Sequence, residues 1–397
     1  MLKSRRKINI EYSLVQALYW AGFCACSGFA AVFLKQHGYS NSELGLILAA
    51  GNILGFLLSP MLAAYVDRVR RKGLFASNLL LLTMELALVL SFMLRPERGI
   101  FMTVGYSLYM ACVVCVNPLN TQLCFTLEEQ YGHINFGAAR SMGSMAYALV
   151  STLMGTLVER LGINTILYTA CLFILLQGAM MVLLYLQSRD ALPREERSRE
   201  SSEKSSSLPR FFVENRTFCI LMLGVSLLFF AHNLVCSFMI NLVVNVGGST
   251  GQMGGINGFM ALVELPAMIL YDRLSHRVKC AHVLRFAALM FVFKAAAFAM
   301  AGSVLGLYAA CALQATSFAL LVPASVHYVN LYVPHKDSTK GQSVSLAATT
   351  LGNVFACSLG GLLYDAISIL SVLLIGTAAA ALGALICFAC TRQALKA

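Results

Sequence analysis

The sequence predicts an all-α polytopic membrane protein. Of its 397 residues, 58% are hydrophobic and only 12% are charged, whereas soluble domains carry about 25% charged residues. Apolar stretches of about 20 residues, the length that crosses a bilayer, recur along the whole chain. Because lipid offers the backbone no hydrogen-bond partners, spanning segments must be helices or closed barrels, and long runs without alternation are typical of helices.

We predict twelve transmembrane helices from these runs. They cover residues 12–34, 44–66, 73–94, 100–125, 137–158, 163–187, 214–240, 252–271, 281–302, 304–331, 341–363 and 367–390. The first run is too long for the hydrophobic region of a signal peptide, so we expect it to be retained. The 13 cysteines are scattered through apolar runs, which favours small buried side chains over disulfides or a metal site.

Basic residues gather on one side of the predicted helices. Lys and Arg precede the first helix and cluster after the second, sixth and eighth helices, in segments such as DRVRRK and DRLSHRVK. This asymmetry predicts a cell-membrane protein with both termini in the cytoplasm, and it accounts for the net charge of +11. We expect these clusters to face anionic lipid rather than nucleic acid.

The two halves of the chain repeat each other. Residues 188–212 are rich in Ser and charge and predict a cytoplasmic linker between six-helix bundles at 1–187 and 213–397. Landmarks on the two sides of this linker recur at an offset of 204 to 206 residues. They are Pro60 and Pro266, Asp67 and Asp272, Pro118 and Pro323, and Gly137 and Gly341. Four pairs in one register indicate duplicated halves.

The end of the second predicted helix resembles a family signature. Asp67, Arg68 and Arg71 in YVDRVRRK match the G-x-x-x-D-R-x-G-R-R pattern of the major facilitator superfamily, whereas Ala63 and Arg70 occupy its glycine places. The resemblance implies a transporter of two parallel six-helix repeats, with substrate held between them near the middle of the membrane. It also implies that Asp67, Arg68 and Arg71 form a conformational latch.

The stretch NFGAARSMGSMAYAL resembles the fifth helix of the lactose permease branch, which includes proton-coupled oligosaccharide, nucleoside and phenylpropionate permeases. Arg140, Ser144 and Tyr147 follow the spacing i, i+4, i+7 and therefore share one helix face. The resemblance implies that Arg140 binds substrate hydroxyls and that Tyr147 stacks on a substrate ring, which suits a guanidinium and an aromatic face. The alternative is that Arg140 only reaches the cytoplasmic membrane interface.

The fourth predicted helix carries neutral polar side chains, whereas the family places a carboxylate there as the partner of the arginine. That place is Gln122 in this chain. A neutral residue there favours an anionic or carbonyl-rich substrate over a plain disaccharide. The predicted substrate site comprises Arg140, Ser144, Tyr147, Asn117, Asn120, Gln122 and Gln314.

Three ionisable residues, Glu85, Glu264 and Lys294, lie near the centres of predicted helices, where charge is costly and usually functional. Glu264 and Lys294 have opposite charges and similar depth in consecutive helices, so we expect them to pair. The family carries a histidine and a glutamate in the tenth helix, where this chain has Gln314 and Ser317. We therefore predict that Glu264 alternates between a protonated form and a form paired with Lys294. A purely structural pair is the alternative.

The sequence carries no phosphate-binding loop and no catalytic set of side chains, so we expect neither an enzyme nor a cofactor. The resemblance implies a monomeric secondary transporter that couples protons to the import of a sugar, glycoside, nucleoside or aromatic acid by alternating access. A proton-antiport exporter of amphiphilic compounds and a non-transporting receptor on the same fold are the alternatives. The substrate and the roles of Glu85, His232 and His327 stay open.

Overall fold

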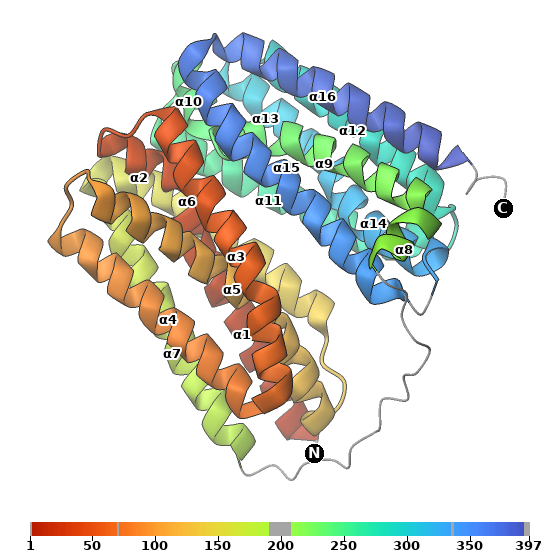
Figure 1. The fold of residues 1–397 in the computed structure, drawn as a ribbon. Helices are drawn as coiled ribbons and strands as arrows, with labels where there is room; N and C mark the ends of the chain where they lie inside the picture. The colour runs from red at the N-terminus through yellow and green to blue at the C-terminus, as the bar shows by residue number, and fades with distance from the viewer. Residues whose placement is uncertain (1, 70, 190–207, 335–336, 393–397) are drawn as a thin grey trace. The chain divides into compact units, whose positions relative to one another are not determined.

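The computed structural model describes residues 2–69, 71–189, 208–334 and 337–392, and the regular elements in these ranges are helices (Figure 1). The first part of the chain forms α1 (Leu2–Phe23), η1 (Cys24–Gly28), α2 (Ala30–Gln36), α3 (Asn41–Val69), α4 (Arg71–Leu94), α5 (Ile100–Tyr131), α6 (Phe136–Leu161) and α7 (Thr165–Arg189). The second part forms α8 (Leu208–Glu214), α9 (Arg216–Cys236), α10 (Met239–Asn245), α11 (Thr250–Ser275), α12 (Cys280–Met300), α13 (Val304–Ala312), η2 (Leu313–Ala315), α14 (Phe318–Tyr332), α15 (Ser338–Ala366) and α16 (Ile369–Cys390).

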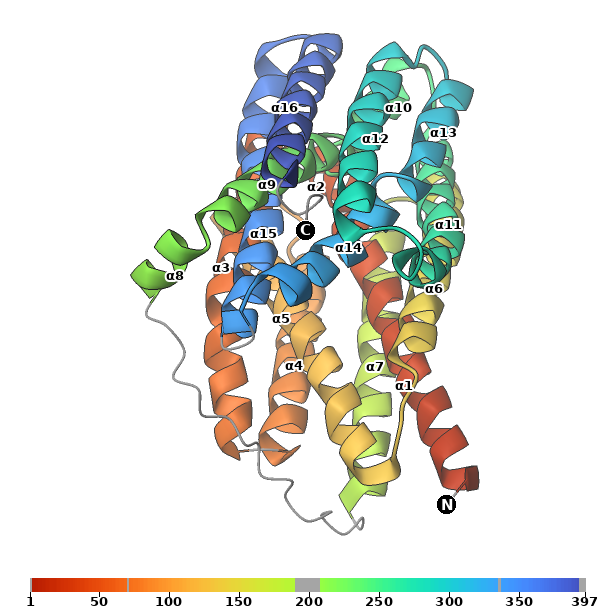
Figure 2. The ribbon, with the colours of Figure 1, turned by 90° about the vertical axis from the view of Figure 1, so that its right-hand side faces the viewer.

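The helices form two compact units. One comprises Met1–Ser198 and Thr250–Ala261, and the other comprises Arg199–Ser249 and Leu262–Ala397, so α11 contributes to both. In the first unit α1 packs against α6, and α4 packs against α5 and α7 (Figures 1 and 2). Most of the predicted linker at 188–212 falls on residues 190–207, which lie outside the described residues, so the predicted bundle boundaries stay a prediction.

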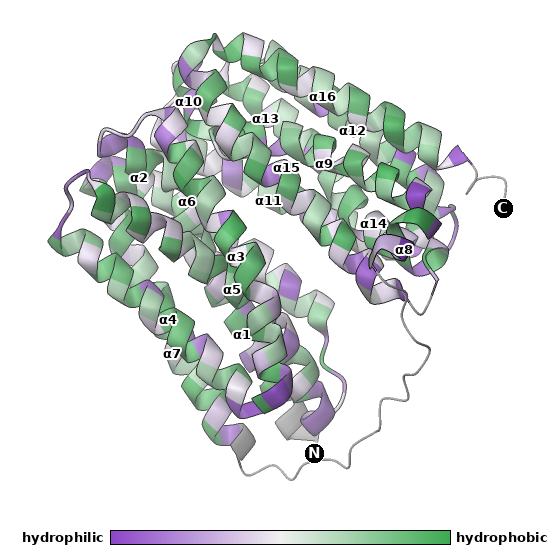
Figure 3. Ribbon diagram, viewed as in Figure 1, coloured by the Kyte–Doolittle hydropathy of each residue, from purple (hydrophilic) through white to green (hydrophobic). Residues whose placement is uncertain are grey.

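Within the described ranges, eleven helical segments are long and apolar enough to cross a membrane. The predicted helix at 252–271 is not among these eleven, but it is present as the continuous helix α11. Figure 3 shows apolar residues along the lengths of the long helices and hydrophilic residues mainly near their ends. Large apolar side chains such as Leu94 and Met300 are more than four-fifths exposed, which suits lipid rather than water. The prediction of an all-α, multi-pass membrane protein is confirmed.

Three predicted helices are interrupted, which the sequence analysis did not anticipate. The first is divided into α1, the π-helical turn η1 and α2; the seventh into α9 and α10; and the tenth into α13, the 3₁₀ turn η2 and α14. Each break contains a polar residue, Ser27, Ser237 or Gln314, but the apolar run continues on both sides, so hydrophobic pattern alone does not reveal the breaks. A break changes the direction of side chains and frees backbone groups, and such turns are frequent at functional sites.

The repeated prolines lie inside helices at corresponding places in the two halves. Pro60 is in α3 and Pro266 is in α11, the second helix of each half. Pro118 is in α5 and Pro323 is in α14, which belong to the fourth helix of each half. Because proline removes a backbone donor and clashes with the preceding turn, each can bend its helix at the same place.

Helices α3 and α5 approach closely because two glycines of α3 lack side chains. A Cβ on Gly51 would lie 2.5 Å from Met110 Cβ, and a Cβ on Gly55 would lie 2.7 Å from Val114 Cβ. The interior of a protein is packed too densely to absorb such an addition without movement. The glycines therefore set the distance between these two helices.

We predict that Gly51→Val destabilises the protein, because the added methyl groups must push α3 away from Met110 of α5. Overpacking of this kind costs about 1–3 kcal/mol. The matched control is Gly178→Val in α7, where a Cβ meets nothing within 4 Å. The measurement is the Tm of each variant in detergent. Equal Tm values for the two variants would contradict the packing argument.

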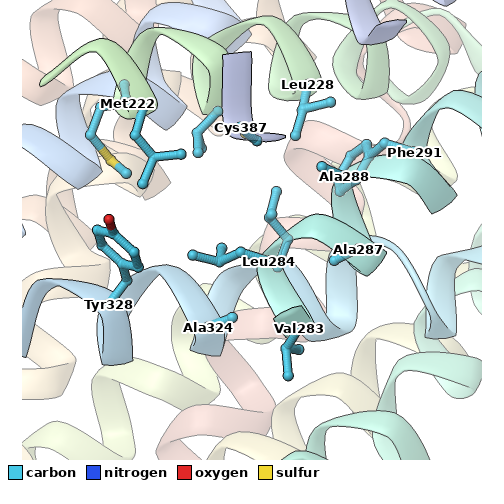
Figure 4. Close-up of a cluster of buried hydrophobic side chains, with 14 of the residues drawn as sticks. Met222, Leu228, Val283, Leu284, Ala287, Ala288, Phe291, Ala324, Tyr328 and Cys387 are labelled. Atoms are coloured by element: carbon cyan, nitrogen blue, oxygen red, sulfur yellow. The ribbon is translucent and has the colours of Figure 1, made fainter. Parts of the chain in front are cut away.

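The second unit has an apolar core shared by α9, α12, α14 and α16 (Figure 4). Leu228, Leu284, Phe291, Tyr328 and Cys387 meet there, each from one of these four helices, and each is at most 4% exposed. Burial of this apolar surface holds the four helices together. About one helical turn beyond this core lie two buried polar side chains, His232 of α9 and Lys294 of α12.

Candidate functional site

A chain of hydrogen bonds links four helical segments in the second unit. Lys294 Nζ on α12 lies 3.0 Å from His232 Nδ1 on α9 and donates to Gln314 Oε1 in η2 at 2.7 Å. Gln314 Nε2 donates in turn to Glu264 Oε1 on α11, also at 2.7 Å. Lys294 is 3% exposed and Gln314 is 1% exposed. We call these four residues the Lys294 network.

The break in the tenth predicted helix places Gln314 in this network. Gln314 lies in the 3₁₀ turn η2, between α13 and α14. The backbone N–H groups of Thr316 and Ser317 both donate to the carbonyl of Leu313, and the Ser317 hydroxyl donates to the same carbonyl at 2.7 Å. These bonds satisfy polar groups that the break would otherwise leave unpaired in an apolar environment. Ser317, at the family's glutamate place, therefore has a structural role here.

His232 accepts a hydrogen bond from the Lys294 ammonium group. An ammonium group has only donors, so the Lys294 ammonium donates to His232 Nδ1 and the imidazole is neutral, with its proton on Nε2. The rings of Phe229, Phe291 and Phe318 surround the imidazole. The ammonium also lies 4.7 Å from the centroid of the Phe291 ring, a favourable cation–π arrangement. His232 thus orients the lysine.

The expected direct pair between Glu264 and Lys294 stays a prediction. The two residues belong to one network, but their link runs through the Gln314 amide. The physical reason is the turn η2, which brings an amide with one donor end and one acceptor end between the carboxylate and the ammonium. Gln314 was expected to bind substrate; its amide is engaged at both ends, and its substrate role stays a prediction.

In the first unit, Arg140 stacks on the only tryptophan of the chain. The guanidinium carbon lies 3.9 Å from the centroid of the Trp20 ring, and Nη1 donates to Ser144 Oγ at 2.8 Å. Gly143 permits this packing of α6 on α1, because a Cβ there would collide with the indole. The predicted face of α6 thus lies against α1, and Arg140 is half-buried.

Tyr147, the third residue of this face, lies against the π-helical break. A Cβ on Gly28 of η1 would lie 3.0 Å from the Tyr147 hydroxyl oxygen. The expected spacing of Arg140, Ser144 and Tyr147 is therefore realised on one helix face, along the break in the first predicted helix. Sequence reasoning missed Trp20. Its only signal was that it is the single tryptophan of the chain, inside the first apolar run.

The polar residues of α5 do not share one environment. Asn117 is exposed, Gln122 is half-buried and Asn120 is fully buried. The Tyr12 hydroxyl donates to the Asn120 carbonyl at 3.1 Å, which ties α5 to α1. Among the described residues, the Asn120 side-chain amide has no hydrogen-bond partner. The three residues were expected to bind substrate together, and this stays a prediction.

The predicted latch lies at the junction of α3 and α4. Asp67 and Arg68 are exposed in the last turn of α3, and Arg71 begins α4 and is half-buried. Residue 70, between them, lies outside the described residues. The ion pairs found among the described residues include none for Asp67. The latch stays a prediction.

Comparison with known proteins identifies the family. The model of the MFS_1 like family matches residues 9–374. The chain is 23% identical over 379 residues to the uncharacterized transporter YwbF of Bacillus subtilis (strain 168), covering 93% of this chain and 90% of YwbF. It is 26% identical over 364 residues to the maltose permease of Geobacillus stearothermophilus, covering 89% and 87% of the two chains. The crystal structure of the nucleoside transporter NupG shares the fold, with a TM-score of 0.75 at 12% identity over 97% of this chain and 99% of NupG.

Proposed function

Since the chain belongs to the MFS_1 like family and is a transporter of the major facilitator type, we propose that it is a proton-coupled importer of a small polar metabolite in the cell membrane. It works by alternating access. The observation that carries the coupling proposal is the Lys294 network, in which an ammonium and a carboxylate are joined inside membrane-spanning helices. Such groups are costly within a bilayer and are usually functional there.

Glu264 is the proposed proton carrier of this network. Its ionised carboxylate stabilises the buried Lys294 ammonium through the Gln314 amide. Protonation removes this negative charge and leaves the ammonium less well compensated, which a buried charge tolerates poorly. The network is therefore expected to rearrange around η2 when Glu264 binds a proton. His232 cannot take this role, because a second ring proton on Nδ1 would face the ammonium.

The contacts of Arg140 support a ring-bearing polar substrate. Its guanidinium combines hydrogen-bond donors with a planar face, and the indole of Trp20 beneath it adds an apolar surface. A sugar or nucleoside offers both hydroxyl groups and a ring face. The maltose permease and NupG are named for substrates of these two classes. An apolar drug would gain little from these polar donors, which favours the importer over the exporter.

The test is uptake into proteoliposomes with an imposed pH gradient, acidic outside. Radiolabelled sugars, nucleosides and aromatic acids form the panel. We expect one class to accumulate inside and to leak out after a protonophore is added. Outward loss of a compound on proton entry would identify an exporter. Absence of flux for every class, with binding retained, would favour a receptor.

Tryptophan emission gives an independent prediction for the binding site. Trp20 is the only tryptophan, and the Arg140 guanidinium lies 3.9 Å from its ring centroid. Substrate that binds Arg140 must change the surroundings of the indole, so emission should shift with the same midpoint as uptake. The control is Trp20→Phe, which removes the signal. Unchanged emission at a substrate concentration that saturates uptake would place binding elsewhere.

A further inference from the structure

Glu85 is a buried carboxyl group that the proposed coupling does not use. It lies near the middle of the membrane-spanning helix α4 and is 5% exposed. Its Oε1 atom has no hydrogen-bond partner among the described residues. Burying a polar atom without a partner is costly, and burying an unpaired charge is far more so. Packing alone therefore does not account for a carboxyl group at this position.

Neutral groups surround this carboxyl group. Tyr109, Cys112 and Cys115 of α5 lie near it. Tyr19 of α1 and Cys26 of η1 also lie near it. All five are weak acids that are uncharged at neutral pH. Among the described residues, the ion pairs found include none for Glu85.

Helix α7 adds a second buried polar side chain, that of Gln177. Gln177 is 4% exposed, and among the described residues its Nε2 atom has no hydrogen-bond partner. Consecutive spanning helices alternate in direction, so α4 and α7 run antiparallel, and the ring contact of Phe75 with Tyr185 sets their register. Counting from that contact, Glu85 and Gln177 differ by two residues, or about 3 Å in depth at 1.5 Å per residue.

We propose that Glu85 is a second proton-binding site of the transporter, protonated in the conformation described here and ionised in the opposite access state. A carboxyl group without a cationic partner in an apolar core keeps its proton, because its neutral form avoids the cost of a buried charge. The reaction is the release of one proton from the carboxyl group to water once a conformational change lets water reach it.

Tyr19 connects this site to Arg140. Its side chain lies near both Glu85 and Arg140, and it packs edge-to-face against Trp20, with ring centroids 5.3 Å apart. A negative charge on Glu85 would attract the guanidinium and compete with substrate for it. A proton on Glu85 removes this competition, so proton binding favours substrate binding, and by reciprocity substrate favours the proton. This last step rests on the proposed function, whereas the proton site itself does not.

Infrared spectroscopy of the protein in lipid tests the site without substrate or a gradient. The wild type should show the carbonyl stretch of a protonated, buried carboxylic acid, and this band should be lost in Glu85→Gln. The matched control is Glu97→Gln in the exposed loop before α5, which should keep the band. Retention of the band in Glu85→Gln, or a band that never changes with pH between acid and alkaline limits, would overturn the proposal.

A second variant distinguishes loss of the carboxyl group from misfolding of the protein. Glu85→Asp keeps a titratable carboxyl group in a shorter side chain, so the band should remain but shift in frequency, whereas Glu85→Gln should lose it. In parallel, the midpoint of the Trp20 emission change should depend on pH less in Glu85→Gln than in the wild type. If no proton-coupled transport is measured but the infrared band behaves as expected, the proposed function is wrong and the proton site at Glu85 is still supported. The two proposals are therefore tested separately.

Discussion

Glu264→Gln should abolish accumulation of substrate against its gradient while leaving exchange of substrate across the membrane measurable. The amide cannot bind or release a proton at physiological pH, and it no longer compensates the Lys294 ammonium through Gln314. Breaking a buried pair by removing one partner costs about 3–5 kcal/mol, and less is expected here because Glu264 is half-buried. The measurements are proton-driven uptake and counterflow in proteoliposomes, with Tm in detergent.

Two controls separate coupling from folding. Glu129→Gln, at the exposed end of α5, should change neither uptake nor Tm. The double variant Glu264→Gln with Lys294→Met removes both charges, so it should regain part of the lost Tm without regaining accumulation. If Glu264→Gln accumulates substrate as well as the wild type, this residue has no part in coupling.

Arg140→Lys should weaken substrate binding strongly without unfolding the protein. Lysine keeps the positive charge but loses the planar fork and the stacking surface that the guanidinium places on Trp20. A hydrogen bond to a charged group contributes about 1.5–3 kcal/mol, and loss of one such bond corresponds to about a ten- to hundredfold rise in Kd. Titration of the Trp20 emission change measures this Kd directly.

The matched control is Arg160→Lys, at the other end of the same helix, where the arginine is exposed. It should leave Kd unchanged. Ser144→Ala should show an intermediate effect, because it removes the hydroxyl that accepts from Arg140 Nη1 and so loosens the guanidinium. An unchanged Kd in Arg140→Lys would support the alternative in which this arginine only reaches the membrane interface.

Much of the fold follows from the sequence because lipid leaves the backbone few choices. Long runs of apolar residues can span a bilayer only as helices. The predicted ends of helices such as α4 and α6 therefore lie within a few residues of those in the structure. The spacing of Arg140, Ser144 and Tyr147 fixed a shared face, since helical periodicity depends on nothing beyond the chain itself. The depth and opposite charge of Glu264 and Lys294 likewise predicted that the two residues pair.

Only the tertiary structure decided which side chains meet. The breaks at η1 and η2 arise where backbone groups find partners from neighbouring turns and helices, and no local pattern of apolar residues encodes them. The turn η2 puts Gln314 between Glu264 and Lys294, and the close approach of α1 and α6 at Gly143 puts Trp20 beneath Arg140. Helical periodicity determines on which face of its own helix a side chain lies. The identity of its partner depends on the packing of separate helices, which is a property of the folded chain as a whole.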